Sequence, residues 1–146
     1  MPILEYHLAE GHYADAQIAE LLVASSHLYA EVLNSPIERV RVFAQFYQPQ
    51  HVAVAGKLLS LGGAPAPYFH FLVLEGRPLD ECHRLLTGFT DLVVKLLHAD
   101  GSLVRGGCWP IPPRYWAIAG TPASLTRAME IGARAKATKP IGTGPG

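Results

Sequence analysis

The sequence contains few charged side chains, few cysteines and no long hydrophobic run. Charged residues make up 16% of the 146 residues, against roughly 25% in an average globular domain. The 12 basic residues balance the 12 acidic residues, so no excess of positive charge favours nucleic acid or an anionic membrane surface. We therefore expect no nucleic acid and no membrane as partners.

Other absences disfavour further classes of protein. No apolar run approaches the ~18 residues of a membrane-spanning helix, and the first residues, MPILEYHLAEG, lack the pattern of a secretory signal. Cys82 and Cys108 are too few for a disulfide framework, and no spacing of histidines indicates a metal site. These features predict a cytoplasmic protein with no cofactor and no metal.

The hydrophobic content, by contrast, is high. Hydrophobic residues other than glycine make up 49% of the chain, which is more apolar surface than one small core needs. The simplest explanation is an oligomer whose interfaces cover the excess.

The first half has the pattern of a βαβ unit. Residues 3–8 form an apolar segment typical of a strand, and residues 40–47 are rich in β-branched and aromatic side chains. Between them, apolar residues recur at steps of three and four over residues 18–33, which predicts an amphipathic helix. A helix between two strands predicts parallel strands joined by a right-handed crossover.

The second half repeats this pattern. A strand is predicted at 67–74, a helix at 82–96 and a closing strand at 115–119. The offset between the halves is 65 at the first strand and about 75 where Arg39 faces Arg114, so we infer an insertion around residues 100–112 and a tandem duplication. The predicted organisation is a βαβ unit at 1–61, a linker at 62–66, a second unit with the insertion at 67–136 and a flexible tail at 137–146.

Pro2, directly after the initiator methionine, is the most unusual candidate for chemistry. Removal of that methionine would leave a secondary amine at the chain terminus. An α-amino group has an ordinary pKa of ~7.7–8.0, and an apolar, cationic surrounding lowers that pKa. The neutral amine could then take a proton from carbon as a general base.

Further motifs in register with Pro2 resemble those of the tautomerase superfamily, founded by 4-oxalocrotonate tautomerase. They are Pro2-Ile3, His7 and Glu10-Gly11, followed by Pro36, Val40-Arg41-Val42, His51, Gly56 and Leu59. The second half carries Pro67 and Leu74-Glu75-Gly76-Arg77. The resemblance covers residues 2–60 well and residues 67–132 more loosely.

The resemblance implies an α+β fold in which two βαβ units form a four-stranded sheet backed by two helices. Three such chains would form a barrel-like homotrimer. The family uses its terminal proline for proton transfer and arginines to bind the carboxylate of a small acid, a task that suits the planar guanidinium.

Carried over by residue, Pro2 is the catalytic proline and Arg77, from the second half, is a substrate-binding arginine. Arg41 matches an arginine that a neighbouring unit supplies in the family. His12 replaces the arginine after the first Glu-Gly, and Val52 replaces an aromatic pocket residue. Pro67 is internal and cannot act as a base, so one site per chain is expected.

The long, duplicated chain also resembles that of cis-3-chloroacrylic acid dehalogenase, which belongs to a fused branch of the superfamily. However, Leu74, Tyr29 and Ile118 stand where that enzyme has an arginine, a histidine and a tyrosine. Glu130 matches its water-activating glutamate only if two residues are inserted before it. We therefore predict a tautomerase for a small unsaturated 2-oxo or 2-hydroxy carboxylic acid. The alternatives are a cis-3-haloacrylate dehalogenase or hydratase with Pro2 as the acid, and an inactive trimeric binding protein.

Overall fold

A computed structural model describes residues 2–126 of the chain. They belong to two compact units, the first ending at Pro110 and the second beginning at Ile111. Glu130 and the predicted tail at 137–146 lie outside the described residues. In the described part of the chain, no helix has the length and apolar character needed to cross a membrane.

Six elements carry the main architecture. In chain order they are β1 (Ile3–Ala9), α1 (Asp15–Leu33), β2 (Arg41–Tyr47), β5 (Tyr68–Leu74), α2 (Leu79–Leu97) and β6 (Arg105–Ile111). Two short hairpins follow β2 and β6, namely β3 (Ala53–Val54) with β4 (Lys57–Leu58), and β7 (Ala117–Ile118) with β8 (Thr121–Pro122).

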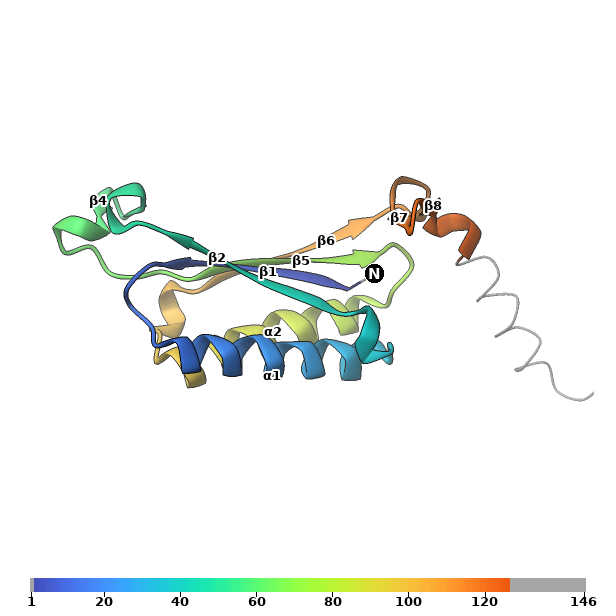
Figure 1. The fold of residues 1–146 in the computed structure, drawn as a ribbon, viewed down its shortest axis with the longest axis horizontal. Coiled ribbons are helices and arrows are strands. Elements are labelled where there is room, and N and C mark those ends of the chain that lie inside the picture. Colours follow the sequence, from blue (N-terminus) through green and yellow to red (C-terminus); the bar gives the residue numbers. More distant parts are fainter. Residues whose placement is uncertain (1, 127–146) are drawn as a thin grey trace, which may run out of the picture. The chain divides into compact units, whose positions relative to one another are not determined.

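The four long strands form one sheet in the order β2-β1-β5-β6. β1 runs parallel to β2, as expected within a βαβ unit, and antiparallel to β5. Both helices cover the same face of the sheet and leave the other face open (Figure 1). The predicted α+β fold of two βαβ units is therefore confirmed.

The core lies between this sheet and the helices, because alternate strand residues point towards them. Fully buried aromatic rings pack edge to face, Phe89 of α2 lying 5.2 Å from Phe71 and 5.3 Å from Tyr29 between ring centroids. The hydroxyl groups of Tyr6 and Ser25 are hydrogen-bonded at 2.6 Å. This bond explains why a serine occurs in the apolar stripe of α1.

The repeat is more regular than the sequence alignment suggested. Every element from α2 to β8 begins the same number of residues after its counterpart in the first half. Only β5 differs, by one residue. The closing strand is Arg105–Ile111, so the prediction of a strand at 115–119 is wrong, and no insertion at 100–112 is needed. The closing strands of the two halves, β2 and β6, begin with equivalent hydrogen bonds. The Arg41 amide donates to the carbonyl oxygen of Pro2, and the Arg105 amide donates to that of Pro67.

Two adjacent glycines in β6 allow a matched test of the packing. A Cβ at Gly106 would overlap the ring of Phe69, which is fully buried, whereas the nearest atom to a Cβ at Gly107 is 3.5 Å away. We expect Gly106→Ala to lower the free energy of unfolding by about 1–3 kcal/mol and Gly107→Ala to change it less. Urea unfolding measures both, and equal effects would contradict this account of the packing.

Candidate active site

Pro2 lies at the start of β1, the inner strand beside β2. Its side chain is buried, and its carbonyl oxygen accepts a hydrogen bond of 2.9 Å from the amide of Arg41. Proline has no amide hydrogen to donate, so the beginning of a strand is one of the few sheet positions it can occupy without loss of a ladder bond. The local structure thus holds Pro2, the residue directly before β1, against β2.

Arg77 reaches the same end of the sheet from the second half of the chain. Because β5 runs antiparallel to β1 and pairs Leu72 with Ile3, the turn after β5 lies at the end where β1 begins. The Arg77 side chain is half-buried, donates to the carbonyl oxygen of Leu33 at 2.7 Å and lies 3.5 Å from a carboxylate oxygen of Glu81. A guanidinium group is therefore held at this end of β1.

The Tyr29 side chain contacts the start of β1 and the end of β5. Its hydroxyl donates to the carbonyl oxygen of Leu72 and lies 3.4 Å from that of Ile3. Burial raises the pKa of Tyr29 far above its ordinary value, and the positive charge of Arg77 offsets only part of this increase. The hydroxyl therefore stays protonated, and it acts as a donor that ties α1 to the start of β1 and the end of β5.

Arg41 is placed beside Pro2 by its backbone, but its side chain is exposed. One guanidinium nitrogen donates to the carbonyl oxygen of Arg39 at 3.3 Å. An exposed guanidinium at the sheet edge is available to a neighbouring chain, which is the role that the resemblance implies for it.

His12 and Val52 lie at the opposite end of the sheet. They follow the carboxyl ends of β1 and β2, where the Glu10 amide donates to the Tyr47 oxygen at 2.8 Å. Within one chain the structure therefore brings Pro2, Arg41 and Arg77 to one end, without His12 or Val52.

The corrected repeat also identifies a residue that the sequence reasoning missed. Val52 ends the short helix Pro49–His51, and Trp116 ends the equivalent helix Pro113–Tyr115 in the second half. The first unit thus has Val52 where the resemblance places an aromatic residue, and the second unit has the aromatic Trp116 at the matching position. The paired prolines 49 and 113 were the signal that would have given the right offset.

Solved structures of other proteins have a similar architecture. No family model and no curated protein sequence matches the chain. Among solved structures, a native fused 4-OT is 25% identical, with a TM-score of 0.79 over 84% of this chain and 97% of that one. A fused 4-OT described as a symmetric trimer is 27% identical, with a TM-score of 0.75 over 85% and 98% of the two chains.

A member of the cis-3-chloroacrylic acid dehalogenase family shares the fold, with a TM-score of 0.72 at 17% identity over 88% of this chain and 90% of that one. Fold and site together define a protein with two βαβ units, a proline at the start of its first strand and an arginine supplied by the other unit. The resemblance to the tautomerase superfamily is confirmed, in its fused form with both units in one chain.

Proposed function

We propose that the chain is a tautomerase that uses Pro2 as a general base on a small unsaturated 2-oxo or 2-hydroxy acid. The observation that carries this proposal is that Pro2 and the turn that bears Arg77, which belong to different halves of the sequence, lie at the same end of the β1–β5 pair. After removal of Met1, the Pro2 nitrogen has a lone pair that can accept a proton from carbon.

The proposed reaction moves one proton and leaves the composition of the substrate unchanged. The Pro2 amine removes a proton from the 2-hydroxy group or from carbon, and the electrons pass into the conjugated system. The protonated amine then returns a proton to another carbon, which gives the isomeric 2-oxo acid. Arg77, with Arg41 from a neighbouring chain, would bind the carboxylate and stabilise the negative charge that develops.

The hydration of haloacrylates is less well supported by the site. Tyr29 stands where the resemblance to the dehalogenase places a histidine, but it is fully buried and bonded to backbone oxygens. Its hydroxyl is already used in bonds to the backbone and does not supply the free polar group that a histidine would, and Glu130, the match for the water-activating glutamate, lies outside the described residues. Isomerisation is therefore the better-supported reaction, and halide release from 3-haloacrylates is the measurement that would favour the alternative.

Arg77 provides the test of substrate binding. We expect Arg77→Gln to lower kcat/KM for ketonisation of 2-hydroxymuconate or phenylenolpyruvate by about 10–100-fold, the loss of one charge-assisted hydrogen-bonded contact. Arg84→Gln, on an exposed position of α2, is the matched control. Equal rates for the two variants would contradict the proposed role, and thermal melts of both separate it from the structural bond to Leu33.

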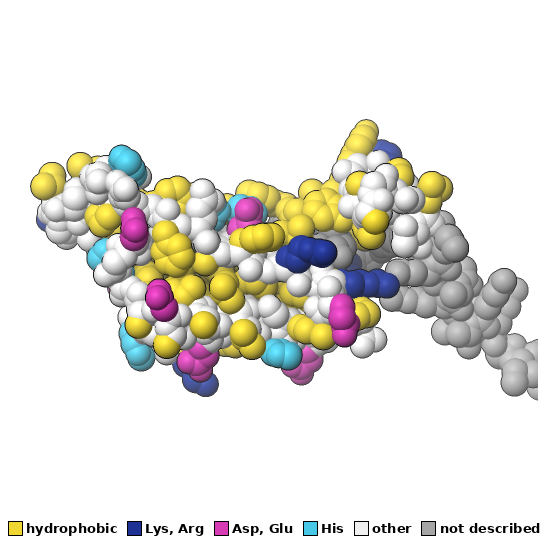
Figure 2. All heavy atoms as spheres, viewed as in Figure 1, with side chains coloured by type: hydrophobic (Ala, Val, Ile, Leu, Met, Phe, Trp, Pro, Cys, Tyr) yellow, Lys and Arg dark blue, Asp and Glu magenta, His cyan; other side chains and the backbone are white. Residues whose placement is uncertain are grey.

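We also propose that the working unit is a homotrimer. Large apolar side chains are exposed on both edge strands, with Phe43 of β2 exposed by 51% and Trp109 of β6 by 46%. Figure 2 shows hydrophobic side chains spread over the visible face with only scattered charges. Four of the similar fused chains are described as trimers.

Light scattering after size exclusion is expected to give three times the 15.8 kDa mass of the chain. Phe43→Glu places a charge on the exposed edge and should shift the mass towards one chain. A wild-type protein that elutes with the mass of a single chain at all concentrations would contradict the trimer.

A further inference from the structure

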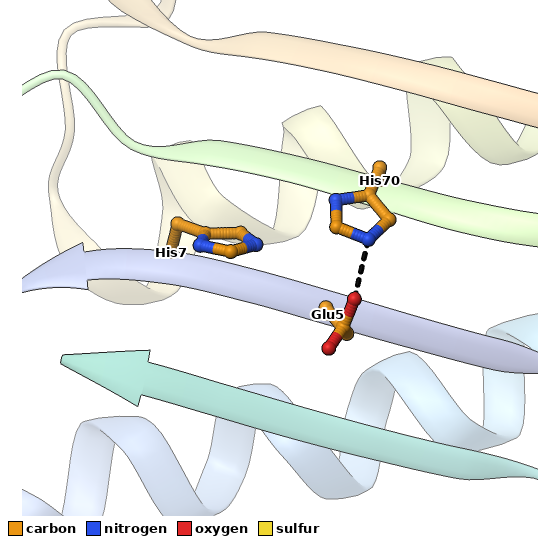
Figure 3. A group of neighbouring side chains, drawn as sticks. All are labelled: Glu5, His7 and His70. Carbon is orange, nitrogen blue, oxygen red and sulfur yellow. Dashed lines mark ion pairs between the residues drawn. The ribbon is translucent and has the colours of Figure 1, made fainter.

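A second group of chemically active side chains lies on the open face of the sheet, away from the helices. Glu5 and His7 belong to β1, and His70 belongs to β5, where it pairs directly with Glu5. One donor atom from each residue lies within 4.8 Å of the other two. Figure 3 shows the three side chains together between these two strands. They come from both halves of the sequence, so no local spacing revealed them.

The hydrogen bonds of this group leave two imidazole nitrogens unused. Nε2 of His70 pairs with a carboxylate oxygen of Glu5, and Nδ1 of His7 is hydrogen-bonded to the hydroxyl of Tyr47. Nε2 of His7 and Nδ1 of His70 are buried and have no hydrogen-bond partner among the described residues. A buried polar atom without a hydrogen-bond partner destabilises the fold, so a ligand that bonds Nε2 of His7 would remove this cost.

Aromatic side chains hold both imidazole rings in place. His70 stacks on Trp109 with 4.2 Å between ring centroids, and His7 stacks on Tyr47 at 5.6 Å. When Nδ1 of His7 donates to the Tyr47 hydroxyl, the lone pair of its Nε2 is left free. Such a bond from the far nitrogen is the usual way in which proteins orient a metal-binding histidine.

We propose that Glu5, His7 and His70 bind a divalent transition-metal ion of the Zn²⁺ type. Two neutral imidazoles and one carboxylate are a donor set that suits Zn²⁺, and three protein ligands leave a fourth position for water or another group. The ion would replace the direct contact of Glu5 with His70 and would bond the unpartnered Nε2 of His7. This site is independent of Pro2 and of the proposed tautomerase reaction.

Metal titration of the full, untagged chain tests the proposal. After dialysis against a chelator, the wild type is expected to bind one equivalent of Zn²⁺ per chain in equilibrium dialysis, and Co²⁺ should give visible absorption bands in the same site. Glu5→Gln and His7→Ala should each weaken binding by more than 100-fold. Tyr47→Phe, which removes only the orienting hydroxyl, should weaken it by about 10–100-fold.

Controls distinguish this site from adventitious binding to the other histidines. His27→Ala, at an exposed position of α1, should leave the affinity unchanged. Zn²⁺ should also raise the melting temperature of the wild type but not that of Glu5→Gln, because only a ligand of the folded state stabilises it. Because Glu5→Gln keeps the shape of the side chain, its Zn²⁺ binding tests the proposed site even if His7→Ala does not fold. No uptake by the wild type, or equal uptake by Glu5→Gln, would overturn the proposal.

Discussion

Pro2→Ala is expected to lower kcat/KM for ketonisation by about 10²–10⁴-fold, the usual contribution of a positioned general acid or base. Alanine is also small enough to allow removal of Met1, so the variant keeps a terminal amine, but a primary one without the ring that fixes its direction. The measurement is the rate of ketonisation of 2-hydroxymuconate or phenylenolpyruvate, with the mass of each intact chain determined in parallel.

The duplication supplies a control of the same residue type. Pro67 is also buried at the start of a central strand, and its carbonyl oxygen accepts a bond of 3.1 Å from the Arg105 amide. Its nitrogen is part of a peptide bond and has no basic lone pair, so Pro67→Ala should retain the rate. If the mature chain begins at Pro2 and Pro2→Ala reacts as fast as Pro67→Ala, the proline is not the base.

Phe89→Ala is expected to have the largest effect on stability, about 3–5 kcal/mol in the free energy of unfolding. The ring has no exposed surface and makes edge contacts with Tyr29, Phe69 and Phe71 at centroid distances of 5.2–5.8 Å. Its removal leaves a cavity between the helices and the sheet, and it also loses the favourable ring–ring geometry.

Leu79→Ala is the matched control for Phe89→Ala, because Leu79 lies on the same helix but is 67% exposed. Urea unfolding at one fixed protein concentration compares them, since association would otherwise change the apparent stability. A loss in Phe89→Ala no greater than that in Leu79→Ala would show that the core is not organised around this ring.

The fold was largely predictable because its two helices and its central strands follow simple periodicities. The stripe from Ile18 to Leu33 in α1 is buried as the spacing of three and four indicated, and β5 begins within one residue of its predicted start. The closing strand was missed because β6 has the sequence RGGCWPI, with two glycines and a proline. These residues have low strand propensity.

Tertiary contacts explain why such a segment is nevertheless a strand. Gly106 is needed where the ring of Phe69 fills the space of a side chain, and Pro110 is tolerated because β6 is an edge strand. The aromatic side chains in residues 115–119 led to the prediction of a strand there. This segment instead contains the end of a short helix and a two-residue strand.

The order of motifs was enough to predict two βαβ units, with Pro2 before the first strand and Arg77 after the first strand of the second unit. Periodicity and motif order are local properties, so they can be read along the chain. The meeting of Glu5, His7 and His70, and the separation of His12 and Val52 from Pro2 within one chain, follow from the pairing of β1 with β5 and with β2. The antiparallel register of β1 and β5 joins residues from opposite halves of the sequence, and it exists only once the two units have paired through a common sheet and core.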